Sequence, residues 1–152
     1  MDKIELSPTF ASFLKCLNDQ QVEYLLVGGY AVNLHGYIRT TNDMDVWIAI
    51  NQTNPQKIIR ALDAFGFDVD RLNEEIFTNE RSIVRFGDEP LKIEVVTTIG
   101  GVEFTDCYRR AETASLAGID VPLISLKDLR INKAASGRPK DLVDLEHLPD
   151  PD

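Results

Sequence analysis

Two aspartates one residue apart are the side chains of this sequence best suited to do chemistry. Asp43 and Asp45 begin an apolar stretch that runs to Ile50. Side chains on a strand alternate between its faces, so the two carboxylates would project from one side with Cα atoms about 6.5 to 7 Å apart. Such like charges are unfavourable together unless a cation or a basic group lies between them. Because oxygen ligands of this kind suit Mg²⁺ or Mn²⁺, the spacing predicts a site for one or two divalent cations, and the alternative is a solvated strand end.

A pair of glycines could supply a phosphate site close to these acids. Gly28 and Gly29 follow the apolar run at 24–27. A turn from strand to helix presents backbone N–H groups and the positive end of a helix dipole, which together bind anions. We therefore expect phosphate at this turn, although a glycine pair is also found in turns that bind nothing.

A third acid lies within another apolar stretch. Glu94 interrupts residues 91–97, where a carboxylate indicates either a ligand or a solvated sheet face. Neighbouring strands are about 4.8 Å apart. If strands at 23–27, 43–50 and 91–97 are adjacent in one mixed sheet, Glu94 comes beside Asp43 and Asp45.

Basic residues are concentrated in one segment of an acidic chain. The formal net charge is −9, which argues against a general nucleic-acid coat protein because such proteins neutralise phosphates with Lys and Arg. Residues 127–140 nevertheless hold five basic side chains and one acidic one. Lys133 and Arg138 in this segment would meet a triphosphate or an RNA acceptor, or belong to a solvated helix face. Arg39 and Thr41, just before the aspartates, would contact phosphate or brace their loop.

Helices and strands that would position these residues follow from apolar spacing, caps and glycine stops. Asn54 and Pro55 are expected to cap the third helix and Gly66 to end it. Hairpins are expected across 87–90 and around 117–120. The helices are predicted at about 8–20, 29–36, 54–66, 105–110, 126–136 and 140–147, and the strands at 23–27, 43–50, 82–86 and 91–97. This pattern predicts an α/β (α+β) fold, a small mixed sheet flanked by helices.

The glycines and acids together resemble the signature of the DNA polymerase beta-like nucleotidyltransferase superfamily. Gly28 and Gly29 are followed after thirteen residues by Asp43-Met-Asp45-Val, and a strand acid comes later at Glu94. A narrower resemblance, to the bacterial nucleotidyltransferase toxins of the abortive-infection E type and their small stand-alone relatives, covers about 22 to 148. It is carried by His35-Gly36, Arg39-x-Thr41-x-Asp43-x-Asp45, Leu129, Lys133, Arg138, Lys140-Asp141-Leu and Asp144-Leu.

This resemblance implies a minimal nucleotidyltransferase fold that moves a nucleoside monophosphate from an NTP to a hydroxyl. It implies two divalent ions, Mg²⁺ or Mn²⁺, held by Asp43, Asp45 and Glu94. Gly28 and Gly29 match the phosphate-contacting turn, so the implied nucleotide-binding residues are Gly28, Gly29, Arg39, Thr41, Lys133 and Arg138. Glu94 stands where aspartate is more usual, and its extra methylene leaves open a role as metal ligand or as base.

Length and composition set the remaining expectations. The 152 residues, 43% apolar and 27% charged, predict a single globular domain over 1–152 with a C-terminal helical portion at about 125–148. No apolar run approaches the roughly 20 residues that span a bilayer, so we expect a cytoplasmic protein with no membrane contact. Cys16 and Cys107 lack the spacing of a disulfide framework or a zinc site.

Two functions of different classes remain in competition. The first is a metal-dependent nucleotidyltransferase acting on RNA, for instance a tRNA end, or on a protein hydroxyl, as the toxin of a toxin–antitoxin pair with an antitoxin or cognate protein partner. The rival is a non-catalytic nucleotide- or protein-binding module, antitoxin-like, on the same fold. The clustered acids favour the enzyme, because a module freed from catalysis has no physical reason to retain them.

Overall fold

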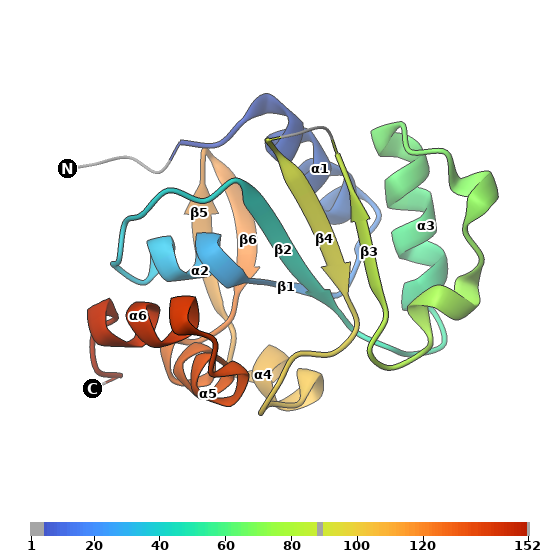
Figure 1. Cartoon of the computed structure of the whole chain (residues 1–152). Coiled ribbons are helices and arrows are strands. Elements are labelled where there is room, and N and C mark those ends of the chain that lie inside the picture. Colours follow the sequence, from blue (N-terminus) through green and yellow to red (C-terminus); the bar gives the residue numbers. More distant parts are fainter. Residues whose placement is uncertain (1–4, 88–89, 152) are drawn as a thin grey trace.

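A mixed sheet organises the part of the chain that the computed structural model describes, residues 5–87 and 90–151 (Figure 1). Its six strands lie in the order β3-β4-β2-β1-β6-β5. They are β1 (Tyr24–Val27), β2 (Asp43–Ile48), β3 (Ile83–Phe86), β4 (Lys92–Val96), β5 (Glu112–Leu116) and β6 (Ile119–Leu123). β2 runs parallel to β4 and β1 runs parallel to β6, while the other neighbouring pairs are antiparallel. The predicted mixed sheet is confirmed.

Helices lie on both sides of this sheet. They are α1 (Pro8–Asp19), α2 (Gly28–Leu34), α3 (Asn54–Phe65), α4 (Phe104–Arg109), α5 (Leu126–Ser136) and α6 (Pro139–His147). Ser7 and Ser125 begin α1 and α5 by accepting a backbone N–H three residues on, and Gly66 ends α3 in the left-handed conformation. Two short 3₁₀ turns, Val69–Arg71 and Glu74–Phe77, were not predicted. None of the helices described is long and apolar enough to cross a bilayer.

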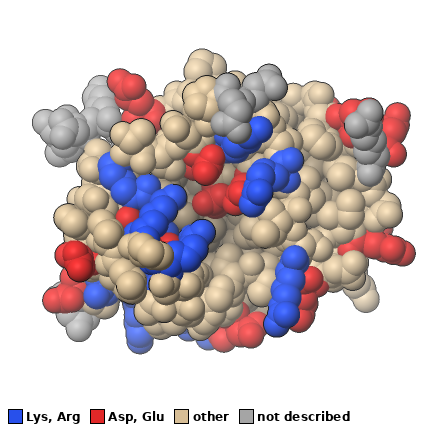
Figure 2. Space-filling model, in the orientation of Figure 1, with Lys and Arg blue, Asp and Glu red and all other residues tan. Residues whose placement is uncertain are grey.

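The alternation of β2 separates its acids from its core residues. Asp43, Asp45 and Trp47 share the face of the sheet on which α2, α5 and α6 lie, at the front in Figure 1. Figure 2 shows this side of the molecule, with acidic side chains near its middle and Lys and Arg on either side of them. The candidate site acids Asp43 and Asp45 therefore lie on the face of the sheet that carries α2, α5 and α6.

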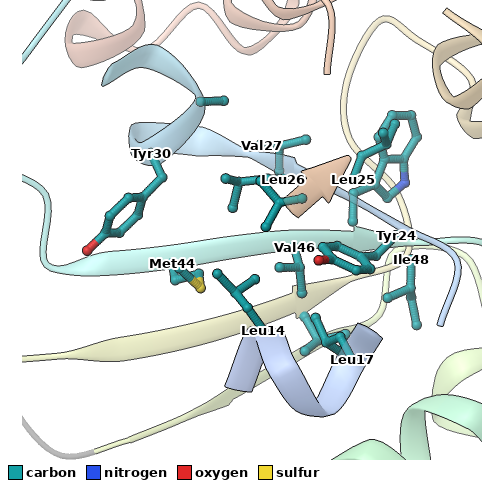
Figure 3. Close-up of a cluster of buried hydrophobic side chains, with 14 of the residues drawn as sticks. Leu14, Leu17, Tyr24, Leu25, Leu26, Val27, Tyr30, Met44, Val46 and Ile48 are labelled. Carbon is teal, nitrogen blue, oxygen red and sulfur yellow. The ribbon is translucent and has the colours of Figure 1, made fainter. Parts of the chain in front are cut away.

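The opposite face of the sheet carries the principal core. Leu14 and Leu17 of α1 approach this face in Figure 3. They meet buried strand residues, which are Tyr24, Leu26, Met44, Val46 and Ile48. This apolar layer fixes the register of β2, because a slip of one residue would bury both aspartates.

The predicted adjacency of three strands is confirmed. β2 lies between β1 and β4, as the three-acid hypothesis requires. The strands at 82–86 and 91–97 pair antiparallel as expected, and a hairpin does form around 117–120. Residues 88 and 89 of the predicted turn at 87–90 lie outside the described residues.

One expectation about α3 is wrong. Asn54 does not cap the helix; it belongs to the first turn and is fully buried. Its Oδ1 accepts the Glu23 N–H at 2.8 Å, and its Nδ2 donates to the carbonyls of Glu23 and Ala49. Asn51 instead accepts the N–H groups of Thr53 and Asn54. The buried amide thus joins the start of β1 to the end of β2.

Replacement of this amide should destabilise the fold. Asn54→Ala removes the side-chain partners of the Glu23 N–H and of the Ala49 carbonyl, which should lower the free energy of unfolding by about 2 to 4 kcal/mol. Asn73→Ala is the matched control, because Asn73 is exposed and makes a single capping bond to Ile76; it should cost about 1 kcal/mol or less. Urea unfolding measures both, and equal losses would contradict the bridging role of Asn54.

Candidate active site

Parallel pairing of β2 with β4 sets the acids side by side. Asp45 is the register partner of Glu94, and Asp43 is that of Lys92. Paired residues of parallel strands project from one face, so Glu94 lies beside Asp45, where the sequence predicted it. Asp43 is exposed, Asp45 is half-buried, and the Glu94 side chain is 23% exposed. We call these three acids, two along β2 and one beside Asp45 on β4, the acidic row. Asp43 is its solvent-exposed end.

Asp45 is the member of this row whose ionised form is least favoured by its surroundings. Its Oδ1 is buried and has no hydrogen-bond partner among the residues that the structure describes. Burial raises the pKa of Asp45 to about 7, and the neighbouring carboxyl groups of Glu94 and Asp43 add to the effect, while the charge of Lys133 opposes it. A buried carboxylate oxygen without a donor fits a site that is completed by a cation.

The glycine turn leaves room for Asp45. Gly28 has φ +68°, and a Cβ there would collide with Asp45 Oδ2. A Cβ on Gly29 would lie 2.5 Å from Thr41 Oγ1, which itself donates to the Asp43 carbonyl. Thr41 therefore braces the loop before β2, one of the two roles predicted for it. The turn predicted to bind phosphate packs directly against the acids.

Buried ion pairs link the end of the chain to this loop. Lys133 of α5 is almost fully buried, and its Nζ lies 3.2 Å from both Asp141 and Asp144 of α6. Arg39 donates from Nε and Nη2 to the two oxygens of Asp144, at 2.7 and 2.9 Å. Burial alone would raise the pKa of Asp144, but hydrogen bonds from Arg39 and Lys133 outweigh it and hold the pKa below its ordinary value. We call these four residues the buried ion network.

Arg138 attaches to the same network from the surface. Its guanidinium donates to both oxygens of Asp141 while its side chain stays 68% exposed. Its hydrogen bonds to Asp141 raise its pKa most, and the charges of Asp45 and Glu94 add to this, which places Arg138 within electrostatic reach of the acids. The pKa of Asp141 is lowered: burial would raise it, but Arg138 and Lys133 prevail. Lys133 and Arg138 thus lie within electrostatic reach of the acids, and Arg39 joins them through Asp144.

Sequence reasoning missed the supporting roles of two aspartates. Asp141 and Asp144 are buried, whereas Leu142 and Val143 between them are 49% and 45% exposed. This inverts the usual helical pattern of apolar residues inside and charges outside. The inverted pattern on α6, beside the basic segment at 127–140, is the signal that could have predicted buried ion pairs. The alternative of a solvated helix face is wrong for Lys133.

The donor set fits a divalent cation in part. Asp43 and Asp45 offer carboxylate oxygens on one face, and Asp45 Oδ1 has no other partner. Glu94 instead accepts a hydrogen bond from Arg85 of β3. In residues 5–87 and 90–151, accordingly, no three acidic, His or Cys side chains are grouped as a metal cage. The residues fit a cation if Glu94 exchanges Arg85 for it.

Two cavities flank the acids without containing them. One of about 720 Å³ adjoins the loop before β2 and is lined by Tyr30, Arg39 and Thr41 among others. A larger one, about 810 Å³, opens beyond Trp47 and is bordered by Phe104 and Tyr108. Trp47 itself is buried under Phe104 of α4, with ring centroids 5.1 Å apart, so it does not present a stacking surface. One cavity thus lies by the loop that precedes Asp43, and the other lies by Trp47, which shares the face of Asp45.

Crowding between Gly28 and Asp45 gives a first test of this geometry. Gly28→Ala should lower stability through the positive φ and through the displaced carboxylate, and it should abolish Mn²⁺ binding at Asp45. Gly118→Ala is the matched control, since Gly118 has φ +80° but no atom within 4 Å of an added Cβ; it should lower stability by about 1 kcal/mol. Thermal melts with and without Mn²⁺ compare the two. Retained Mn²⁺ binding in Gly28→Ala would refute the cradle.

The raised pKa of Asp45 predicts how stability depends on pH. The pKa rises from 3.8 unfolded to about 7 folded, so the folded state loses stability as pH rises through this window. Asp45→Asn removes the charge, and in EDTA its stability advantage over the natural protein should grow by about 2 to 4 kcal/mol from pH 4 to pH 8. Asp120→Asn, an exposed strand aspartate, should show no such growth. Parallel pH profiles for all three proteins would contradict the assignment.

Comparison with known proteins shows the family of the chain. A family model described as "Nucleotidyltransferase of unknown function (DUF6036)" matches residues 9–148. Curated proteins give no significant match. The fold is similar to that of a "putative nucleotidyltransferase" from Thermotoga maritima, with 14% identity, 90% of this chain and 87% of that chain covered, and a TM-score of 0.62.

A second solved structure extends the similarity over nearly the whole chain. It is the lincosamide antibiotic adenylyltransferase LnuA bound to lincomycin, with 15% identity, 99% of this chain and 100% of that chain covered, and a TM-score of 0.63. At such identities these two likenesses concern the fold, whereas the family model covers most of the sequence itself. The chain belongs to the nucleotidyltransferase family of unknown function and is an enzyme of that class.

Proposed function

We propose that this enzyme transfers a nucleoside monophosphate from an NTP to a hydroxyl group, with Asp43, Asp45 and Glu94 as its acidic centre. The observation that carries the proposal is the buried, unpartnered Oδ1 of Asp45 beside Glu94. A carboxylate in this state is unfavourable in the free protein and becomes favourable when a cation and a polyanion are bound. Membership of an enzyme family removes the support for the rival, non-catalytic module.

The aspartates would bind the divalent cation, and Glu94 would have one of two roles in the transfer. Asp43 and Asp45 would hold Mg²⁺ or Mn²⁺, as one or two ions, through their shared face. A divalent cation supplies charge stabilisation to the transferring phosphoryl group. Glu94 would either complete this ligand set or accept the proton of the attacking hydroxyl. Its place beside Asp45, on the half-buried face, is compatible with both roles.

Several groups would bind the triphosphate. The backbone of Gly28 and Gly29 faces the acids, because Cβ atoms there would collide with Asp45 and Thr41. Arg39 and Lys133, fixed by buried carboxylates, would contribute a positive field more than direct contacts. Arg138 is largely exposed and would reach phosphate itself.

In the first form of the proposal, the acceptor is a hydroxyl group of RNA or of a protein. A small hydroxyl-bearing molecule is a second candidate, because LnuA, with lincomycin bound, matches this chain over its full length. The cavities of about 720 and 810 Å³ by the loop before β2 and by Trp47 are large enough for a small molecule or the end of a larger one. A toxin role would follow if the modified acceptor is essential for growth.

Transfer of label tests the proposal and identifies the acceptor. The protein is incubated with each NTP labelled at the α-phosphate, Mg²⁺, and in separate reactions total RNA, cell protein or small hydroxyl compounds. We expect label in one acceptor class, reduced at least roughly a hundredfold in Asp45→Asn because a charged ligand is lost. Asp120→Asn is the control for a strand aspartate elsewhere. Full activity of Asp45→Asn would overturn the proposal, and growth arrest on expression, absent in Asp45→Asn, tests the toxin role.

A further inference from the structure

Arg85 contacts the acidic row from the side opposite the buried ion network. It is the register partner of Glu94 across the antiparallel pair of β3 and β4, and its Nε donates to Glu94 Oε1. β3 is the edge strand of the sheet, and the Arg85 side chain is 61% exposed. A guanidinium at a sheet edge can change partners, because no strand in the described part of the chain packs on the outer side of β3.

The partner of Arg85 sets it apart from the other cations described around the site. Arg39, Lys133 and Arg138 pair with Asp141 or Asp144, which are buried within the protein. Arg85 pairs with Glu94, itself a candidate ligand for the divalent cation. Binding of a cation at the acids would therefore take away the partner of Arg85 and leave the other three pairs intact.

We propose that Arg85 holds Glu94 in the free enzyme and, once a divalent cation takes that carboxylate, turns to bind the phosphates of the incoming NTP. This inference rests on the proposed function and adds a substrate-positioning residue to it. The same positive charge would be used twice, first on a carboxylate and then on a phosphate.

Charge and geometry favour this exchange. Three carboxylates in a row repel one another, so a guanidinium beside Glu94 compensates them while no metal is bound. An exposed ion pair contributes little stability, so a divalent cation that contacts the carboxylates directly can displace it. Adjacent strands lie about 4.8 Å apart, and Arg85 shares the face of Glu94, so its long side chain remains beside the acids after release. Arginine also binds phosphate bidentately.

Opposite effects on two ligands test the proposal. Binding of Mn²⁺ alone is measured by calorimetry at pH 8, above the pKa of about 7 at Asp45, so that proton competition is small. Arg85→Ala should bind Mn²⁺ about three- to tenfold more tightly than the natural protein, because a competitor for Glu94 is gone. A purely structural role for Arg85 would not tighten metal binding.

Nucleotide affinity should change in the other direction. With saturating Mn²⁺ and the α,β-methylene analogue of each NTP, Arg85→Ala should bind the preferred analogue about ten- to a hundredfold more weakly. Arg85→Lys, which keeps the charge but loses the fork, should keep near-natural Mn²⁺ affinity and recover part of the nucleotide affinity. Arg109→Ala is the control, since Arg109 is an exposed arginine paired with Asp106 on α4, and it should change neither value.

Two comparisons separate the possible failures. If Asp45→Asn loses Mn²⁺ binding while Arg85→Ala matches the natural protein for both ligands, the acidic site stands and Arg85 is a surface ion pair only. Weaker Mn²⁺ binding in Arg85→Ala also overturns the exchange. If the natural protein binds neither Mn²⁺ nor any nucleotide analogue, the proposed function fails, and the role of Arg85 fails with it.

Discussion

Placement of a carboxylate where water cannot fully reach it is the constraint on which this molecule depends. Asp45 is held there by the register of β2, which the apolar layer against α1 determines. Two neighbours are restricted as a result. Position 28 has no room for a side chain beside Asp45, and the carboxyl group of Glu94 disfavours ionisation of Asp45. Repulsion among the acids lowers the stability of the free protein. A ligand that removes this repulsion gains the corresponding free energy when it binds. Preorganisation of this kind is how a rigid sheet contributes to phosphoryl transfer.

Burial of a second group of charges complements the first. Lys133 and Arg39 are matched to Asp141 and Asp144 with good geometry, and each carboxylate receives more than one donor. A buried pair of this type is weak evidence for stability, because desolvation offsets much of the attraction. It is better explained as a means of fixing positive charges in one place. The acids therefore face cations whose positions do not depend on flexible surface side chains.

Much of this arrangement could be predicted from the sequence, for identifiable reasons. The order of the elements followed from apolar spacing, caps and the glycine stop at Gly66, and the acid pair followed from the period of a strand. The place of Glu94 followed from strand adjacency, which local pattern alone does not specify; the glycine and acid spacing of a known superfamily supplied it. Prediction worked where one residue's environment was determined by its neighbours in sequence.

What could not be predicted depends on contacts between distant segments. Asn54 was expected to cap a helix, yet its amide bridges two strands. Lys133 was expected to meet a ligand or to lie on a solvated helix face, yet it is buried against Asp141 and Asp144 of α6. The parallel pairing of β1 with β6 likewise joins residues nearly a hundred positions apart, and no turn residue in the sequence predicts it. Tertiary context decided these positions against their local propensity.

The ion pair between Arg39 and Asp144 spans 105 positions of sequence, which has a consequence for the newly made chain. During synthesis the strands that carry the acids emerge before α6, and N-terminal segments fold first. A partly synthesised chain can therefore form the acidic row and place Arg39 before Asp144 has been made. Arg39 then lacks the buried carboxylate that holds it, and Lys133 lacks both of its partners until α6 has been added. The cations near the acids thus take their final positions only once α6 has been translated.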